Sequence, residues 1–267
     1  MRWMILWGLL MPSAALAGTL ELDGMAQQGA LLRGTTEPGT RVTLDGKPVR
    51  VAPDGHFIFG FGRDAPEQAF LELTFKDGSS TKRELSVAQR SYDIQRINGL
   101  APQQVNPDTD LLARIKREGA AVSTARASES DALFFEIPLR WPALGPITGI
   151  YGSQRILNGE PRQPHFGIDI AAPAGSAVLA AGSGKVTLAE HDLYLTGGTI
   201  VIDHGFGLST TYSHLASVDV KVGQALAQGE RIGTVGANGR VTGPHLDWRV
   251  NWYETRLDPM LVAGPMP

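Results

Sequence analysis

Short runs of alternating apolar and polar residues, closed by turn dipeptides, dominate this chain of 267 residues. The first half has Asp-Gly dipeptides at 45–46, 54–55 and 77–78. Such dipeptides favour tight hairpins because glycine and aspartate tolerate a positive φ. Strands at this spacing predict a small antiparallel sandwich over residues 18–90, which we interpret as immunoglobulin-like.

Glycines and brief β-branched runs continue in the second half of the chain, where residues 199–202 read Thr-Ile-Val-Ile. No long helical period interrupts these runs, so residues 134–267 are predicted to form a second domain of mostly antiparallel sheet. The whole chain is therefore predicted to be mainly β.

Residues 91–133 are predicted to be a linker that contains one short amphipathic helix. Asn106 is the expected cap and Pro107 the first helical residue. The apolar stripe of this helix consists of Leu111, Leu112 and Ile115. We expect Gly119 to end the helix, and residues 123–131 to form a mobile connector or a surface loop.

Residues 1–17 have the pattern of a secretory signal peptide, with Arg2, an apolar run and small residues at 15–17. No later stretch approaches the roughly 20 apolar residues of a spanning helix, so no transmembrane segment is expected. The sequence has no cysteine, which excludes disulfides and a lipid-modified cysteine. A net charge of -3 argues against nucleic acid as a partner, because that partner needs clustered Lys and Arg.

Five of the six histidines follow residue 164, and two of them pair with an acid. In extended chain His165 and Asp169 project to the same face, with Gly167 between them leaving room for an ion. His245 and Asp247 share a face in the same way. Imidazole nitrogen and carboxylate oxygen both bind zinc, and these residues can supply three protein ligands with one position left for water.

A third run offers His214, with Tyr212 expected on the same side. The patterns His165-x-x-x-Asp169, Tyr212-x-His214-Leu215 and Gly243-Pro244-His245-Leu246 resemble the three signatures of the lysostaphin-type (LytM-like) zinc endopeptidases. The resemblance covers residues 147–258. It implies a sheet of the duplicated hybrid motif type, a single zinc ion in a groove, and peptidoglycan peptides as substrate.

The resemblance also implies roles for individual residues. His165 and Asp169 would be metal ligands, while His214 and His245 would be catalytic acid-base residues. The family has a histidine as its third ligand where this chain has Asp247. Aspartate binds zinc through oxygen, but its charge should make the metal a weaker Lewis acid and favour a harder divalent metal than zinc.

Arg155 and Tyr212 are the candidate substrate-binding residues. For Arg155 a surface ion pair is the alternative to a contact with a substrate carboxylate. Trp248 is predicted to pack in the core, because alternation places it opposite Asp247. His204 is interpreted as a hairpin turn residue.

Two functional hypotheses follow from these patterns. The first is an exported, periplasmic metallo-endopeptidase that cuts the stem peptides or crosslinks of peptidoglycan. The second is a catalytically inactive regulator that binds the cell wall or activates a separate wall amidase, and Asp247 at a ligand position motivates it. The N-terminal sandwich carries no evident chemistry, so it is a candidate docking site for a protein partner.

Overall fold

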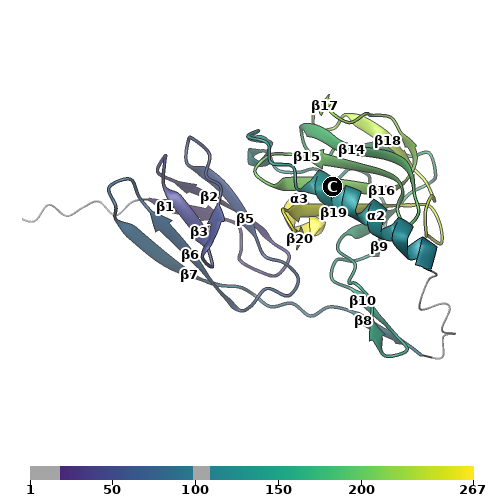
Figure 1. Ribbon diagram of the computed structural model, residues 1–267, viewed down its shortest axis with the longest axis horizontal. Coiled ribbons are helices and arrows are strands. Elements are labelled where there is room, and N and C mark those ends of the chain that lie inside the picture. The colour runs from purple at the N-terminus through teal and green to yellow at the C-terminus, as the bar shows by residue number, and fades with distance from the viewer. Residues whose placement is uncertain (1–18, 99–108) are drawn as a thin grey trace, which may run out of the picture.

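The computed structural model describes residues 19–98 and 109–267. It is mainly β, as the sequence predicts, and the strands pair almost entirely antiparallel (Figure 1). The predicted signal peptide and the expected helix cap at Asn106 and Pro107 lie outside the described residues. Among the described residues no helix combines the length and apolar character that crossing a membrane requires.

The N-terminal unit consists of two antiparallel sheets, in the strand orders β1-β2-β5 and β4-β3-β6-β7. Both sheets supply one core, in which Phe57 and Phe59 are fully buried together with Leu71 and Leu73. The glycines of all three Asp-Gly dipeptides have positive φ, as the hairpin prediction requires. The strands are β1 (Leu20–Asp23), β2 (Leu31–Thr36), β3 (Arg41–Leu44), β4 (Lys47–Val49), β5 (His56–Gly60), β6 (Gln68–Thr74) and β7 (Ser80–Ser86).

Helix α2 (Thr109–Arg126) continues through Gly119, so the prediction that this glycine ends the helix is wrong. A Cβ added at Gly119 would have no neighbouring atom within 4 Å. Glycine inside a helix costs only about 1 kcal/mol of stability relative to alanine. Packing compensates for that cost, because Ala125 contacts a buried cluster with Leu188 and Val201 of the sheet. The part of the predicted connector before Ala127 is therefore helical.

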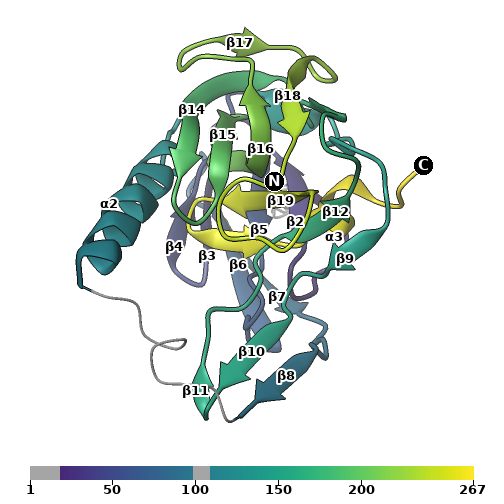
Figure 2. The same ribbon diagram turned by 90° about the vertical axis from the view of Figure 1, so that its right-hand side faces the viewer.

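The predicted linker also contributes a strand to a small separate sheet of order β11-β10-β8 (Figure 2). Here β8 (Ile94–Ile97) pairs in parallel with β10 (Gln154–Leu157), and β10 pairs with β11 (Glu160–Pro161). A strand of the predicted linker thus pairs with a strand that lies beyond residue 134.

The second domain is built on a ten-stranded antiparallel sheet with the path β17-β14-β15-β16-β19-β12-β9. Its further strands are β13 and β18, which pair with each other, and β20, which pairs with β19. The elements are β9 (Ile147–Gly149), β12 (Ile168–Ala171), β13 (Ala177–Leu179), β14 (Gly184–Leu193), β15 (Gly197–Asp203), β16 (Leu208–Val218), β17 (Ala225–Leu226), β18 (Arg231–Val235), β19 (His245–Trp252), β20 (Thr255–Leu257), the short helix α3 (Pro259–Ala263) and the 3-10 turn η1 (Phe134–Glu136).

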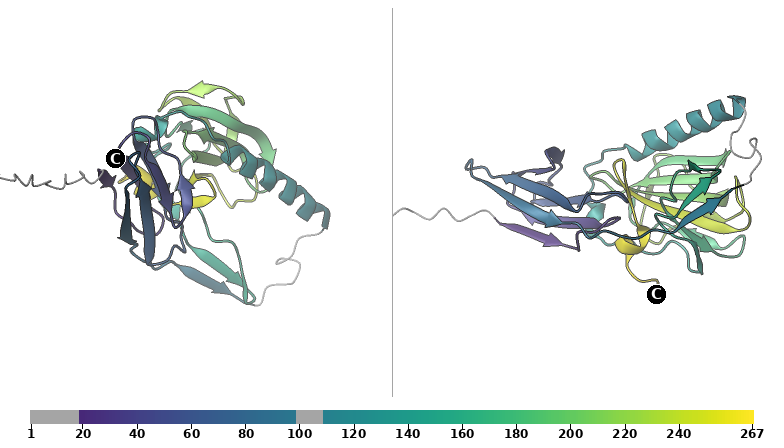
Figure 3. Two further views of the ribbon diagram at one scale, coloured as in Figure 1. Left: turned by 60° about the vertical axis from the view of Figure 1, so that its left-hand side comes forward. Right: turned by 90° about the horizontal axis from the view of Figure 1, so that it is seen from below.

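The two faces of this sheet differ in what covers them. One face carries the main core, in which Tyr212 and Trp248 are fully buried, so the packing role predicted for Trp248 is confirmed. The other face is covered in part by α2 (Figure 3). Ala125 of this helix packs on Val201 of β15. That second face also holds the polar residues of the site.

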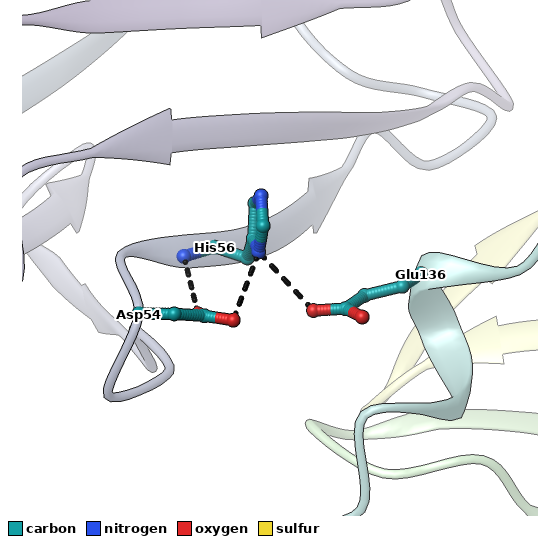
Figure 4. A group of neighbouring side chains, drawn as sticks. All are labelled: Asp54, His56 and Glu136. Atoms are coloured by element: carbon teal, nitrogen blue, oxygen red, sulfur yellow. Dashed lines mark hydrogen bonds and ion pairs between the residues drawn. The ribbon is translucent and has the colours of Figure 1, made fainter.

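The sandwich and the second domain are packed together. Leu31 and Ile58 of the sandwich belong to the same buried cluster as Phe135 of η1. At the surface of this junction His56 Nδ1 lies 3.1 Å from Asp54 Oδ2 and 3.1 Å from Glu136 Oε1 (Figure 4). All three of these side chains are more than a third exposed, as in an ordinary surface ion-pair network, which adds little stability.

Candidate metal centre

Three side chains that could ligate a metal ion converge between β12 and β19. Asp169 and Asp247 are direct partners in the ladder of these two strands. His165 reaches them from the segment before β12, with its Nε2 3.3 Å from Asp169 Oδ1. One ligand atom from each residue lies within 4.8 Å of the other two. The structure therefore brings together the three residues that the sequence singled out as ligands.

His165 is not part of the strand itself, because β12 begins at Ile168. Its backbone is fixed by the preceding loop instead. The His165 N–H donates to Ser153 O at 2.8 Å, and the His165 carbonyl accepts from Gly152 N at 2.8 Å. These bonds hold the ring against Asp169 without the strand periodicity that the sequence suggested.

The space between the three ligands suits an ion. His165 Nε2 is buried and has no hydrogen-bond partner of acceptable geometry among the described residues. A Cβ at Gly149 would lie 2.1 Å from Asp169 Oδ2, and one at Gly167 would lie 2.8 Å from Asp247 Oδ1. Two glycines thus keep the approaches to both carboxylates open. One imidazole and two carboxylates form a donor set that zinc and harder divalent ions accept.

Asp247 is held by Arg249, two residues further along the same strand face. The Arg249 Nε lies 2.9 Å from Oδ1 and 3.1 Å from Oδ2 of Asp247, and Nη2 also donates to Oδ2. Burial acts to raise the pKa of Asp247, but the charge and hydrogen bonds of Arg249 outweigh burial and lower the pKa to about 2. The carboxylate is therefore ionised, and its remaining lone pairs stay available for a metal ion.

His214 and His245 lie beside the ligands, with their ring centroids 4.8 Å apart. His214 Nδ1 lies 2.9 Å from Asn238 O, and His245 Nδ1 lies 2.9 Å from Gly243 O. Because a carbonyl oxygen only accepts, each Nδ1 carries a proton, and Nε2 is the ring nitrogen left to act at the site. His245 Nε2 faces the ligands, 3.8 Å from Asp169 Oδ1.

Burial lowers the pKa of His214, whose residue is 7% exposed. The ring is therefore neutral at pH 7 and can accept a proton at Nε2. An unusual backbone places it: His214 has φ 65°, and its N–H donates to Thr196 O at 2.7 Å. This left-handed conformation breaks the alternation of β16 at His214.

The broken alternation corrects the expectation that Tyr212 lines the groove on the same side as His214. Tyr212 is fully buried in the core, opposite Trp248 in the ladder. Its hydroxyl accepts from Ala181 N at 2.9 Å and from Thr210 Oγ1 at 2.9 Å. Tyr212 thus supports the sheet behind the site and has no surface to offer a substrate.

Arg155 is exposed on β10, in the small sheet that is separate from the strands that carry Asp169 and Asp247. A contact between Arg155 and a substrate stays a prediction. His204 lies in the hairpin between β15 and β16, as expected for a turn residue, but its ring is fully buried. Its nitrogens lie 2.7 Å from Ser183 O and 2.8 Å from Thr210 Oγ1, which is a structural role.

The sequence reasoning missed Arg249. The signal was present, because Asp247 and Arg249 are two residues apart in a predicted strand and must therefore project to the same face. An arginine at that position can form the ion pair without which a buried carboxylate is costly.

The chain is similar to known peptidases over part of its length. Peptidase family M23 matches residues 163–259. The peptidoglycan DD-endopeptidase ShyA of Vibrio cholerae is 44% identical over 103 residues, which are 39% of this chain and 24% of that protein. The cell division protein DipM of Caulobacter vibrioides is 34% identical over 125 residues, 47% of this chain and 20% of that protein.

A crystal structure from Pseudomonas aeruginosa, described under peptidase M23, is similar over a larger part of the chain. It is 28% identical with a TM-score of 0.65, and the match covers 93% of this chain and 94% of that one. By contrast, the chain spans only about a quarter or less of the length of the two curated relatives.

Proposed function

Because residues 163–259 form a domain of peptidase family M23, we propose that this protein is a metallo-endopeptidase that hydrolyses peptide bonds in peptidoglycan. The observation that supports it best is the convergence of His165, Asp169 and Asp247 beside two imidazoles with free Nε2 atoms. The names of relatives such as ShyA support peptidoglycan as the substrate. An exported, periplasmic protein is the corresponding proposal for its location.

In this proposal His165, Asp169 and Asp247 hold one divalent ion. When bound, the ion supplies Lewis acidity toward a peptide carbonyl and activates water. His214 Nε2 accepts a proton, and its Nδ1 bond to Asn238 O keeps the ring in the required tautomer. His245 Nε2, close to Asp169, is placed to stabilise charge that develops on the reacting carbonyl.

Zinc is the proposed ion, with another divalent metal as the alternative. Two carboxylates in the ligand set bring a formal charge of about zero with a divalent ion, whereas a second histidine would leave it positive. Arg249 offsets this difference, because its guanidinium shares the negative charge of Asp247. The pair of Asp247 and Arg249 thus supplies an oxygen ligand whose net charge approaches that of a neutral imidazole.

Replacing Arg249 by glutamine is expected to weaken metal binding about 10- to 100-fold, the usual cost of losing a partner that orients a ligand. The change removes the hydrogen bonds from the Arg249 guanidinium to Asp247, so the orientation of the carboxylate is no longer fixed. Competition with a chelator of known affinity measures the effect. The matched control is Arg83→Gln on the exposed strand β7, and equal metal affinity in all three proteins would contradict the role of Arg249.

The function itself is tested with the full chain, purified and loaded with zinc, on isolated peptidoglycan. The expected result is release of peptide fragments whose new amino termini show that peptide bonds were cut, together with about one bound metal ion per chain. Intact peptidoglycan and no bound metal would overturn the proposal, and they are the result that a non-catalytic regulator of a separate amidase would give. Retention of the protein on peptidoglycan sacculi without cleavage would point the same way.

A further inference from the structure

The polar face of the central sheet is organised in three rows that start at the metal centre. In the first row Ser213, Asp247 and Asp169 are neighbours across β16, β19 and β12. Strand alternation places the next rows on the same face, two and four residues along β19. The second row consists of Thr211 and Arg249. The third row consists of Ser209, Asn251 and Arg256, the last of which belongs to β20.

The second and third rows gather arginines. Arg249 and Arg256 lie on this face and are partly exposed. Arg126, the last residue of α2, is 7% exposed and close enough to both for their charges to interact. Among the described residues neither Arg126 nor Arg256 has an ion-pair partner within 4.0 Å, and Arg249 is engaged by Asp247.

Two of these three cations lack a close anion within the described ranges of the chain. Burial, followed by the charges of Arg126 and Arg249, lowers the pKa of Arg256 to about 10. Asp247 and Asp169 act on Arg249, whereas the acid that acts on both Arg126 and Arg256 is Glu254. Glu254 is exposed, and it accepts a bond from Ser123 Oγ at 3.5 Å. Like charges held together in this way favour the binding of an anion.

The floor beneath the arginines is also unsatisfied. Asn251 is fully buried and Ser209 and Thr211 are 2% and 3% exposed, yet Asn251 Nδ2, Ser209 Oγ and Thr211 Oγ1 have no hydrogen-bond partner in the described part of the chain. Arg126 Nε is buried without a partner as well. A buried donor left unpaired costs about 1–3 kcal/mol, so four such groups on one face call for a ligand or water.

We propose that Arg126, Arg249 and Arg256 form an anion subsite that takes a carboxylate of the peptide substrate. The inference rests on the proposed function, because it assumes a peptide lying over the metal centre. Rows two residues apart along a strand are separated by roughly 7 Å, about the length of two extended residues of a bound peptide. The subsite therefore selects a peptide whose free carboxylate lies about two to four residues from the bond at the metal.

Arginine is suited to this role because its planar guanidinium binds a carboxylate through two parallel hydrogen bonds. Arg256 has one long side-chain bond, from Nη1 to Asn251 Oδ1 at 3.5 Å, which leaves its other N–H groups for a carboxylate. Arg126 closes the site from the end of α2. Arg249 adds charge, since its Nε and Nη2 are already engaged by Asp247. Helix α2 thereby becomes a wall of the substrate site rather than a spacer between domains.

The test measures binding in metal-free full-length protein, so that neither a metal ion nor hydrolysis contributes. The probes are N-acetyl-alanyl-alanine with a free carboxylate and the same dipeptide with a carboxamide. Titration followed by NMR gives both affinities for wild type, Arg256→Gln, Arg126→Gln and the control Arg83→Gln. We expect wild type and the control to bind the dipeptide with the free carboxylate at least about tenfold more tightly than the dipeptide with the carboxamide.

Arg256→Gln and Arg126→Gln are each expected to lose most of that preference. A thermal melt shows whether Arg126→Gln, at a buried position, still folds. If that variant does not fold, the result for Arg256→Gln, at a partly exposed position, decides. Equal affinity of wild type for acid and amide overturns the subsite, as does a preference that survives both substitutions. Acid-selective binding without cleavage of peptidoglycan by the zinc-loaded protein would instead overturn the proposed peptidase and leave the subsite in place.

Discussion

Replacing His165 by alanine is expected to remove the bound metal ion and to reduce hydrolysis of peptidoglycan to background. His165 supplies the single imidazole of the ligand set, and its Nε2 is a buried atom with no other partner of acceptable geometry among the described residues. Without His165 only the carboxylates of Asp169 and Asp247 remain as ligands, and their mutual repulsion favours separating them when no cation is bound between them. Metal content by elemental analysis and peptide release from peptidoglycan measure the two effects.

The control for this substitution is His191→Ala, which removes an exposed histidine from β14 and should change neither metal content nor activity. Thermal unfolding in the presence of a chelator separates loss of the ligand from loss of the fold. Equal zinc content in the His165 variant and in wild type would contradict the ligand assignment. Loss of metal in both histidine variants would show that the bound ion lies elsewhere.

Strand alternation explains why the face that carries His245 and Asp247 could be predicted from the sequence, whereas His165 lies before β12 and is placed by its loop. The side-chain period of two places His245 and Asp247 on one face and Leu246 and Trp248 on the other, and the structure has both sets as expected. The same rule extends from Asp247 to Arg249 and needs no tertiary information. Local periodicity was therefore sufficient for the part of the site that lies on β19.

Other features depend on backbone and tertiary structure that no periodicity encodes. The left-handed φ of His214 reverses the side to which its ring points, and with it the assignment of Tyr212. Histidine rarely adopts this conformation, so a sequence gives no reason to expect it. The bond from His214 N to Thr196 O, across a loop, helps to hold it in place.

The path of α2 illustrates the same limit. Its apolar stripe was visible in the sequence, but the end of the helix was set by packing of Ala125 on Val201, 76 residues away, and not by Gly119. Likewise β8 was hidden in a predicted linker because its partner β10 lies far along the chain. Long-range pairing of this kind leaves a weak local signal.

Replacing His214 by alanine is expected to leave metal binding intact and to lower the rate of hydrolysis about 10²- to 10⁴-fold, the usual contribution of a general acid-base group. His214 is not among the converging ligands, and its Nε2 is kept free by the bond from Nδ1 to Asn238 O. The loss should appear in kcat with KM little changed, because the ring acts on the proton rather than on substrate binding. Steady-state kinetics on a soluble crosslinked peptide, with metal content measured on the same sample, checks both expectations.

Two results would contradict this role in different ways. A variant with full kcat would show that another group takes the proton, and His245→Ala would then be expected to carry the whole loss. A variant that loses its metal along with activity would make His214 a ligand, which requires its ring to leave Asn238 and turn toward Asp247. The bond between His214 Nδ1 and Asn238 O argues against the second result, because it already engages one ring nitrogen and would have to break if the ring turned.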